Sequence, residues 1–512
     1  MRSKVKYLAA LLSLGYVALL AVLLLAERSD PNASITSFSD AFWYSVVTLS
    51  TVGYGDLYPV TVLGRIIGVC FVLMSIGVLS LVLSFVINLL TGKMLPAFRL
   101  WKVRKRQWYV FDEINEESLA LAESLAGEFP DAAILFPQSE GRSDDYYTYP
   151  DTIARTVAEK KGHCTLFFMG QNSQTANYKN AMAAQQLGFP VYCCTSQVPD
   201  ALPEGLTVFN RYDCCAREYW RREALRGQEN VIILIGDGAY ATSLLEQGLM
   251  VNVFDRSRQV KYHVFGDWSE FRRNHPSLGQ TVSISGKDER MDALYFHDAP
   301  WNEDGELLLQ AHRIILCGDR DEDNLEVLGK LRTYFPVDAA VHIRLGEEIP
   351  GENVFGLNRQ VYTADMVIRG ETHRMAKLIH EIYAEGSGGT APSWEQLNLF
   401  LRQSNLAAAD HLLTKIRYLL DDDGITQENA EICAGAYRCY CETKAERCET
   451  YREMEHRRWM RFHSLYNWTY APVRDNKLRR HPAMRPYDEL TLQEQIKDDY
   501  SWELLAGLAE RL

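Results

Sequence analysis

The sequence lacks several features that would assign it to a common class of protein. Its 11 cysteines form no CxxC pair, although two pairs are adjacent, Cys193-Cys194 and Cys214-Cys215. This pattern excludes a zinc ribbon and a disulfide scaffold, and it predicts reduced thiols in a cytoplasmic setting. No segment carries arginine at regular helical spacing, which excludes voltage sensing by a charged helix.

Charge is unevenly divided along the 512 residues, of which 47% are apolar. Residues 1–106 contain 11 Lys+Arg and 4 Asp+Glu, a net charge of +7. Because the whole chain has a net charge of −13, the remaining residues carry a net charge of −20. A surface of that sign repels phosphate backbones and argues against nucleic-acid binding. The length indicates three or four domains.

Two uncharged apolar runs are long enough to cross a bilayer as helices. Residues 7–26 and residues 66–91 form runs of 20 and 26 residues, and a hydrocarbon core requires about 20. Arg2, Lys4 and Lys6 precede the first run, but it is too long for a signal-peptide core and no small-residue cleavage site follows it. We therefore expect two spans.

Basic residues also crowd the far side of the second run: Lys93, Arg99, Lys102, Arg104, Lys105 and Arg106. Together with the basic N-terminus, they place both termini in the cytoplasm of a protein of the cell (inner) membrane. The connection at residues 27–65 then lies outside.

Within that connection, residues 41–49 form a short apolar stretch that Ser39 or Asp40 can cap as a helix. At about 1.5 Å per residue this helix crosses less than half of a bilayer, so we expect it to be re-entrant. The loop that follows it reads Thr51-Val52-Gly53-Tyr54-Gly55-Asp56. Its glycines permit positive φ, so successive carbonyls, with the Thr51 hydroxyl, can replace the water shell of a dehydrated cation.

The loop Thr51 to Asp56 resembles the signature sequence of potassium channels, and the likeness covers about the first hundred residues, including Trp43 and Tyr44. The resemblance implies K+ as permeant ion and a homotetramer in the lipid bilayer, because one chain supplies only one wall of a filter. The alternative for the loop is a simple extracellular turn. Gly77 lies where the gate of this family can bend, although glycine there also allows close helix packing.

From residue 107 onward, short apolar strands alternate with amphipathic helices, which is typical of parallel α/β lobes. The first lobe has candidate strands at 108–111, 132–135, 165–169 and 191–194, with helices at 117–125 and 175–187. Its first strand leads into a segment with four carboxylates and no glycine, residues 112–117. We expect no pyrophosphate there, and the acidic segment favours a helix start over a cation site.

The second lobe follows a polar helix at 215–226, and its first strand, 230–235, leads into Gly236-Asp237-Gly238-Ala239-Tyr240-Ala241. This is a GxGxxA motif in the strand-turn-helix setting of a Rossmann nucleotide site. Asp255, expected at the end of a strand at 249–254, is placed to bind ribose hydroxyls. Asp237 adds negative charge to the loop, so a structural or vacant cleft is the alternative.

A pore followed by such lobes resembles the potassium channels that carry regulator-of-potassium-conductance (RCK) domains. The likeness covers residues 107 to about 385, with the Gly236 motif and Asp255 as its most specific residues. It implies a cytoplasmic ring of lobes whose shape responds to an ion or an adenine nucleotide such as NAD, ATP or a cyclic nucleotide. Such a ligand moves the gate only through different affinities for two ring shapes.

The C-terminal part begins with a linker at 386–392 and continues as predicted helices at 394–404, 407–420 and 427–463. Cys433, Cys439, Cys441 and Cys448 do not share one helix face, so no metal site beyond K+ in the filter is predicted.

Aromatic and basic residues at the end of the chain resemble the ryanodine-receptor (RyR) repeat, and the likeness covers about residues 394–499. The resemblance implies a ligand site for an adenine nucleotide at Trp459, Trp468, Tyr470, Arg474, Asp475 and His481. Asn467 and Ala471 stand where that family has glycine. For Trp459, a place in a helical core is the alternative.

The sequence thus predicts an α-helical two-span pore, two α/β Rossmann-like lobes and a small, mainly helical C-terminal domain. The expected boundaries are 1–98, 99–225, 226–385 and 386–512. The predicted function is a ligand-gated potassium-selective channel, not an enzyme. One alternative is a membrane-anchored NAD-dependent enzyme, but the sequence offers no identifiable catalytic acid, base or nucleophile near Gly236. A subunit of a potassium transporter is the other alternative.

Overall fold

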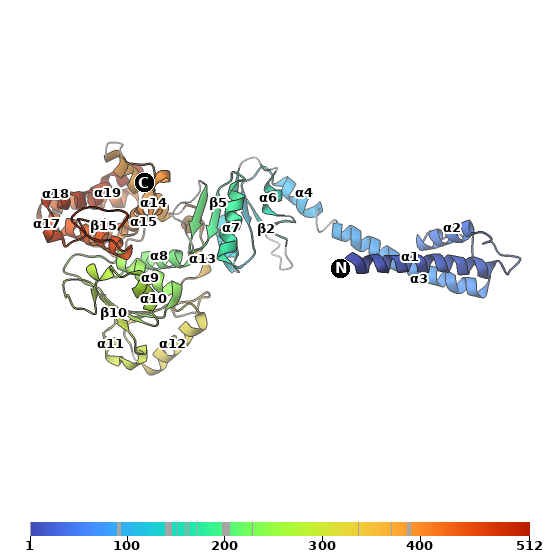
Figure 1. Ribbon diagram of the computed structural model, residues 1–512, viewed down its shortest axis with the longest axis horizontal. Coiled ribbons are helices and arrows are strands. Elements are labelled where there is room, and N and C mark those ends of the chain that lie inside the picture. Colours follow the sequence, from blue (N-terminus) through green and yellow to red (C-terminus); the bar gives the residue numbers. More distant parts are fainter. Residues whose placement is uncertain are drawn as a thin grey trace. The chain divides into compact units, whose positions relative to one another are not determined.

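The computed structural model describes residues 2–89, 94–138, 146–150, 152–158, 160, 163–170, 173–196, 205–227, 229–335, 337–369, 371–386 and 391–512. By their contacts they form two compact units. We call residues 1–104 with 148–150 the helical unit, and residues 105–147 with 151–512 the α/β unit. Figure 1 shows the elements of each unit.

The helical unit consists of α1 (Arg2–Glu27), α2 (Phe38–Leu49), α3 (Val62–Leu89) and α4 (Leu95–Lys102). A small apolar core joins α1, the segment before α2, α2 and α3, and it contains Leu20, Leu23, Ile35, Ala41, Ile67 and Phe71. Within the described residues, Val62–Ile87 is the one stretch long and apolar enough to cross a membrane, and Leu14–Glu27 is a shorter apolar helix. The expected span at residues 7–26, and with it the count of two spans, therefore stays a prediction.

The short helix before the loop begins earlier than the sequence indicated. Its cap is Ser37, whose Oγ accepts from the Asp40 backbone N–H at 3.2 Å, while the Asp40 carboxylate accepts from the Ser37 N–H at 2.8 Å. The prediction of Ser39 or Asp40 as the cap was wrong, because Asp40 serves as the third residue of a capping box. The helix still has only 12 residues.

Lobe 1 contains a six-stranded sheet in the order β3-β2-β1-β4-β5-β6, whose strands belong to the α/β unit except for the last two residues of β3. Its strands are β1 (Trp108–Phe111), β2 (Ala133–Pro137), β3 (Tyr147–Tyr149), β4 (Cys164–Phe168), β5 (Val191–Cys194) and β6 (Leu206–Phe209). Its helices are α5 (Glu116–Glu128), α6 (Ile153–Val157) and α7 (Gln174–Gln185). The pairings from β2 to β6 are parallel. This is the doubly wound Rossmann order, with its reversal between β1 and β4.

Lobe 2 repeats this order with one additional edge strand, β9. Its parallel strands are β7 (Val231–Ile235), β8 (Lys261–Phe265), β9 (Ser283–Ile284), β10 (Ala293–His297), β11 (Arg313–Leu316), β12 (Ala340–Arg344) and β13 (Asn353–Phe355). Its principal helices are α9 (Gly238–Val251), α10 (Ser269–Asn274), α11 (Gly305–Gln310) and α12 (Asp321–Tyr334). The predicted strand at 249–254 was wrong, since Leu249–Val251 complete α9, a helix so buried that its apolar end resembles a strand.

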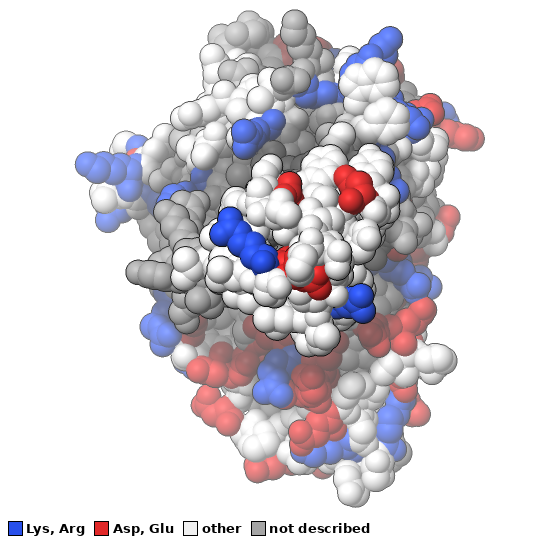
Figure 2. All heavy atoms as spheres, turned by 90° about the vertical axis from the view of Figure 1, so that its right-hand side faces the viewer, with Lys and Arg blue, Asp and Glu red and all other residues white. Residues whose placement is uncertain are grey.

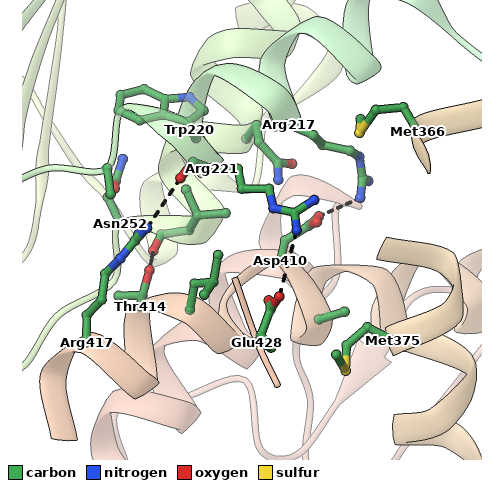
Figure 3. Close-up of a pocket in the computed structure, with 15 residues that line it drawn as sticks. Arg217, Trp220, Arg221, Asn252, Met366, Met375, Asp410, Thr414, Arg417 and Glu428 are labelled. Atoms are coloured by element: carbon green, nitrogen blue, oxygen red, sulfur yellow. Dashed lines mark hydrogen bonds and ion pairs between the residues drawn. The ribbon is translucent and has the colours of Figure 1, made fainter. Parts of the chain in front are cut away.

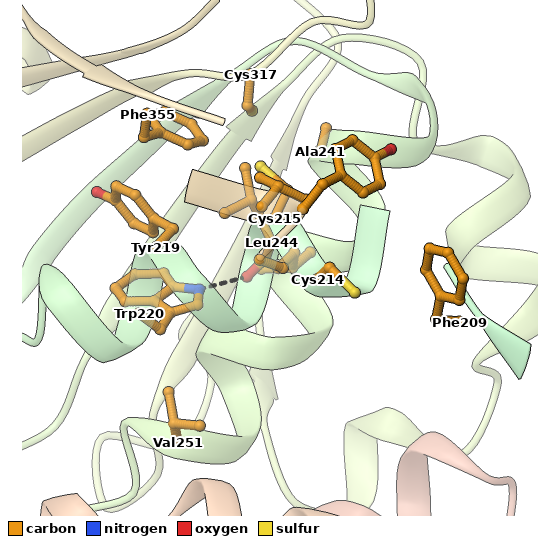
Figure 4. Close-up of a cluster of buried hydrophobic side chains, with 14 of the residues drawn as sticks. Phe209, Cys214, Cys215, Tyr219, Trp220, Ala241, Leu244, Val251, Cys317 and Phe355 are labelled. Carbon is orange, nitrogen blue, oxygen red and sulfur yellow. Dashed lines mark hydrogen bonds between the residues drawn. The ribbon is translucent and has the colours of Figure 1, made fainter. Parts of the chain in front are cut away.

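The two lobes exchange helices. α8 (Arg211–Arg222) follows β6 of lobe 1 but packs on α9 of lobe 2, where Trp220 Nε1 donates to the Leu244 carbonyl at 2.8 Å. α13 (Asn358–Val361) follows β13 of lobe 2 but packs on α5 of lobe 1. Figure 4 shows part of the continuous apolar core that results, around Tyr219, Trp220 and Leu244. The lobes are therefore one structural body.

The C-terminal part is mainly helical, with α14 (Glu371–Gly386), α15 (Leu399–Asp410), α16 (Leu412–Leu420), α17 (Ala430–Leu465), α18 (Leu492–Gln495) and α19 (Tyr500–Arg511). A short sheet pairs β14 (Thr469–Tyr470) with β15 (Arg480–His481). α14 shares one core with α16, α17 and α19, through Met375 and Ile379 beside Trp502. The expected boundary at 385/386 therefore falls at the end of a helix that belongs to this domain.

Candidate functional site

The loop after α2 has the backbone geometry that its glycines permit. Thr51, Gly53 and Gly55 have φ values of 60°, 58° and 72°, and ordinary residues stand between them. The Val47 carbonyl accepts from the N–H groups of Val52 at 3.1 Å and Gly53 at 3.3 Å, which fastens the loop to the end of α2. When residues with positive φ alternate with residues of negative φ, the carbonyl groups of successive residues can point to the same side of the loop.

All six residues of this loop are exposed, including Val52 at 53% and Tyr54 at 69%. Figure 2 looks onto the loop end of the helical unit, where uncharged atoms predominate and charged ones are scattered. An exposed apolar side chain beside a fixed loop is expected where another surface completes the site. Among the described residues of the single chain, no other segment covers these six residues.

Aromatic side chains of α2 support the loop from the side. Trp43 Nε1 donates to Asp56 Oδ2 at 2.8 Å, and the Trp43 and Tyr54 rings stack with centroids 6.3 Å apart. Behind them, the Tyr44 hydroxyl lies where a Cβ on Gly68 would meet it at 2.6 Å, so Gly68 lets α3 approach α2 closely. Side-chain packing, and not the loop alone, therefore fixes its position.

Glu27, which the sequence reasoning did not select, ties α1 to the segment before α3. Its carboxylate is fully buried and accepts from the Val60 N–H at 2.8 Å, from the Thr61 N–H at 3.1 Å and from the Thr61 hydroxyl at 2.6 Å. A Cβ on Gly64 would lie 1.9 Å from the same carboxylate. A single acid at the end of an apolar run was the signal that could have revealed it.

Gly77 lies within α3, which continues unbroken through it. A Cβ there would meet nothing within 4 Å, so packing in one chain does not require glycine. Ser75 and Ser80 donate their hydroxyls to the carbonyls of Val72 and Ile76 at 2.6 and 2.7 Å. Such bonds loosen the helical backbone locally.

In lobe 2, the predicted phosphate loop has the expected turn and an unexpected occupant. Gly236 and Gly238 have φ of 135° and 89°, and Ala241 is fully buried at the start of α9. The N–H groups of Ala239 and Tyr240, which would face a phosphate, donate to the Asp319 carboxylate at 3.2 and 3.1 Å. Asp237 Oδ2 accepts from the Asp267 N–H at 2.9 Å. These residues do not fit a bound pyrophosphate.

Asp255 lies away from this loop. It precedes β8 and accepts from the Ser257 N–H at 2.9 Å and the Tyr418 hydroxyl at 2.9 Å, so it faces α16 of the C-terminal domain. The acid at the carboxyl end of the second strand is Asp267, which caps the following turn through the Ser269 N–H at 3.0 Å. The ribose role assigned to Asp255 depended on the mistaken strand.

In lobe 1, the edge of the sheet where the strand order reverses, between β1 and β4, is also filled by side chains of the chain itself. Asp112, at the end of β1, accepts from the Met169 N–H at 2.8 Å, and burial raises its pKa to about 6. Asn177 donates to the carbonyls of Gly170 and Cys194 at 2.7 and 3.3 Å. A Cβ on Gly170 would lie 2.8 Å from the Glu113 carboxylate. The acidic segment acts as a helix start, with Asn115 as the cap of α5.

Three of the predicted RyR-like residues meet in an aromatic cluster. Trp459 contacts His481 edge-on with ring centroids 5.0 Å apart, and Trp468 lies 6.4 Å from His481. Trp468 is buried, and its indole N–H is one of the buried groups without a partner among the described residues. Burial, with Arg474 nearby, lowers the pKa of His481 to about 4, so its imidazole is neutral at pH 7. Trp459 packs against the small core formed by Met460, Trp468 and Met484, which agrees with the alternative of a place in a helical core.

The other three lie around this cluster. Tyr470 is 49% exposed, Arg474 is exposed and donates to Asn476 at 2.8 Å, and Asp475 accepts from the Lys477 N–H at 2.9 Å. Asn467 has φ of 60°, a left-handed conformation that asparagine tolerates better than most residues other than glycine. An asparagine at this position is therefore compatible with the turn.

A pocket lies where α8 and α9 meet the C-terminal helices (Figure 3). Arg217 pairs with Asp410 at 2.6 Å, Arg221 approaches Glu428 at 4.0 Å, and Thr414 donates to the Val251 carbonyl at 2.8 Å. These polar groups satisfy one another, which indicates a structural junction.

No group of three or more His, Cys, Asp or Glu side chains could hold a metal ion within the described residues. All 11 cysteines are free thiols, and Cys433 is buried while Cys441 is exposed.

Comparison with known proteins concerns mainly the helical unit. Residues 9–92 match a protein family described as "Ion channel". The chain is 46% identical over 65 residues to a voltage-gated potassium channel of Aeropyrum pernix, covering 13% of this chain and 22% of that protein. It is 46% identical over 57 residues to human potassium voltage-gated channel subfamily A member 6, covering 11% of each. The chain thus spans less than a quarter of the length of these relatives.

Among solved structures, the chain is similar to GsuK bound to ADP with 12% identity and a TM-score of 0.34, covering 72% of this chain and 99% of that one. A second similar structure, the GsuK channel bound to NAD, has 11% identity and a TM-score of 0.33, covering 73% and 86%. Likeness at this level establishes neither a shared ligand nor a shared assembly.

Proposed function

We propose that this protein is a ligand-gated, potassium-selective ion channel. The observation that carries the proposal is the loop from Thr51 to Asp56, which combines the potassium-channel signature with positive φ at alternate residues. The match of residues 9–92 to an ion-channel family supports it.

The loop supplies the chemistry of selective conduction. Its carbonyls, with the Thr51 hydroxyl, replace the water shell of K+ at several successive positions, and the carboxyl end of α2 adds negative potential behind them. Anchoring by the Val47 carbonyl and by Trp43 keeps the carbonyl row at a fixed spacing. A smaller cation then finds fewer or longer contacts.

Four copies of the chain complete the pore. Exposed apolar side chains line both α2 and α3, among them Val46, Leu63, Ile66, Val69 and Leu73. In a homotetramer within the cell membrane, some of these side chains face the neighbouring copies and others face lipid. Both termini and the α/β unit then lie in the cytoplasm, as the basic residues beside the spans indicate.

Gating comes from the cytoplasmic lobes and the C-terminal domain. We place an adenine nucleotide at the rim of the aromatic cluster, where the exposed Tyr470 ring and the neutral imidazole of His481 can stack a base. The buried Trp468 contacts His481 from the core side. The exposed basic residues beside the cluster can hold phosphate: Arg474, Lys477 and Arg480. Gly77, with Ser75 and Ser80, is the bending point of α3 in this proposal.

The test is K+ flux into liposomes that contain only the purified protein, with Na+ as the control ion. Adenine and cyclic nucleotides are added one at a time to the side that carries the α/β unit. K+-selective flux that one nucleotide changes, and that Arg474→Ala makes insensitive, supports the proposal. Flux of K+ and Na+ at equal rates contradicts it, and selective flux indifferent to all nucleotides removes the nucleotide assignment.

A further inference from the structure

The motif loop of lobe 2 is filled from within the chain. Asp319 follows β11, the strand beside β7, and its two carboxylate oxygens accept from the N–H groups of Ala239 and Tyr240 in the first turn of α9. These are the donors that a Rossmann motif offers to a pyrophosphate. A carboxylate and a phosphate present the same kind of anionic oxygen, so the two compete for one position.

The glycines of the motif fit this internal carboxylate. A Cβ on Gly238 would lie 2.4 Å from Asp319 Oδ2, and a Cβ on Gly236 would lie 2.5 Å from the Gly318 nitrogen. Each glycine therefore makes room for the turn after β11. The motif needs no external ligand to account for its glycines.

The turn that carries Asp319 is held in place on its other side. Asn324 accepts from the Gly318 N–H at 2.8 Å and donates to the Gly318 carbonyl at 3.0 Å. Arg344 donates to the carbonyls of Gly318 and Asp319 at 2.9 and 3.0 Å. Because Asn324 and Arg344 are both buried, Asp319 is presented to α9 by a rigid support.

Charge at the cleft also disfavours a phosphate ligand. Besides Asp319, the carboxylates of Asp237 and Asp267 stand at the same edge of the sheet, and Asp237 bonds the Asp267 N–H. The guanidinium of Arg344, which holds the Asp319 turn, already pairs with Asp321, and that of Arg320 lies beside Glu322 and Asp323. A pyrophosphate would have to expel one carboxylate and then lie beside two more.

We propose that Asp319 is a built-in ligand of the GxGxxA loop, so that lobe 2 binds no dinucleotide at this motif and uses it to join the β7–α9 turn to the β11–α12 turn. The inference stands apart from the proposed channel function and is compatible with a nucleotide bound in the C-terminal domain. In lobe 2 the motif therefore serves as a structural connection between two turns and not as a ligand site.

The first test is hydrogen exchange at the amides of Ala239 and Tyr240 in the full-length protein. Without nucleotide, both amides should be protected, and Asp319→Ala should speed their exchange about tenfold or more, since each loses a bond to a charged acceptor. Asp267→Asn is the matched control and should leave both amides unchanged. Unchanged exchange in Asp319→Ala overturns the proposal.

The second test does not depend on a variant. The wild-type protein is labelled with a photoreactive NAD analogue, and the labelled peptides are identified, with inorganic pyrophosphate as competitor. We expect no saturable label between residues 229 and 335, wherever else label appears. Saturable label at residues 236–241 that pyrophosphate displaces overturns the proposal. Neither readout requires ion flux, so failure here is distinct from failure of the channel proposal.

Discussion

The loops at residues 53–55 and 236–238 each contain two glycines with one residue between them, and only the first loop leaves its backbone carbonyls and surface open. Gly53 and Gly55 in the helical unit and Gly236 and Gly238 in lobe 2 all have positive φ. The first loop is exposed along its whole length, whereas the N–H groups after the second already bond Asp319. A glycine-rich loop is therefore a binding site only where no internal group satisfies it.

The largest expected effect tests the open loop. Gly53→Ala places a side chain at φ of 58°, a conformation that costs about 1–2 kcal/mol and displaces the neighbouring carbonyls. We expect K+ flux in liposomes to fall by about a hundredfold or more, since selective conduction depends on carbonyl position.

Gly15→Ala is the matched control, because Gly15 lies inside α1 with open space around its Cα. Its flux should equal that of the wild type. Equal flux from both variants would mean that ions do not pass along this loop.

The next effect tests how firmly lobe 2, which contains the filled loop, is joined to the C-terminal domain. Arg461 and Asp292 are each 1% exposed and pair at 2.9 Å, and Arg461 also donates to the Leu249 carbonyl at 3.2 Å. Arg461→Met leaves Asp292 buried with less compensation, so the free energy of unfolding should fall by about 3–5 kcal/mol. Chemical denaturation followed by tryptophan fluorescence measures it.

Arg511→Met removes an exposed pair with Glu385 and should cost less than about 1 kcal/mol. The double variant Asp292→Asn with Arg461→Met should regain part of the loss. If Arg461→Met and Arg511→Met cost the same, the buried pair does not join the two parts.

A smaller effect concerns the filled edge of the sheet in lobe 1. Burial raises the pKa of Asp112 to about 6, so the folded protein holds this proton more tightly than the unfolded chain does. Its stabilising contribution, about 3 kcal/mol, is present below about pH 4 and is lost as pH rises through about 6.

Asp112→Asn keeps the acceptor for the Met169 N–H and removes the titration. The difference in unfolding free energy between wild type and Asp112→Asn should therefore change between pH 4 and pH 7. A constant difference over that interval would show that this carboxyl does not titrate with a raised pKa.

The smallest effect concerns the support of the open loop. Trp43→Phe retains a ring against Tyr54 but loses the bond to Asp56, worth about 0.5–1.5 kcal/mol. We expect a few-fold reduction in the preference for K+ over Na+, measured by reversal potential. Trp101→Phe in α4 is the control, and an equal change in both variants would exclude a specific role for Trp43.

The sequence predicted much of this fold because local patterns determine it. The strands at 108–111 and 191–194 were confirmed at the same residues, since compact apolar runs between turns are a direct signal. β8, with Lys261 and His263, was missed because its polar residues hide a strand that is buried by its neighbours. The apolar end of α9 was taken for that strand, and Asp255 was misplaced with it.

The occupant of the lobe 2 loop could not be predicted from local pattern. Asp319 lies about eighty residues after Ala239 and meets it only because β11 is placed beside β7. The doubly wound strand order, together with an acid three residues after the last residue of β11, was the available signal. Long-range contacts of this kind also explain Glu27, whose partners Val60 and Thr61 lie beyond α2.

The most direct test of the central claim is the reversal potential across a planar bilayer that contains only the purified protein, with K+ on one side and Na+ on the other. We expect a potential close to that of a membrane permeable to K+ alone, since in the proposed channel the loop from Thr51 to Asp56 replaces the water shell of K+. A reversal potential near zero, with measurable current, would contradict it.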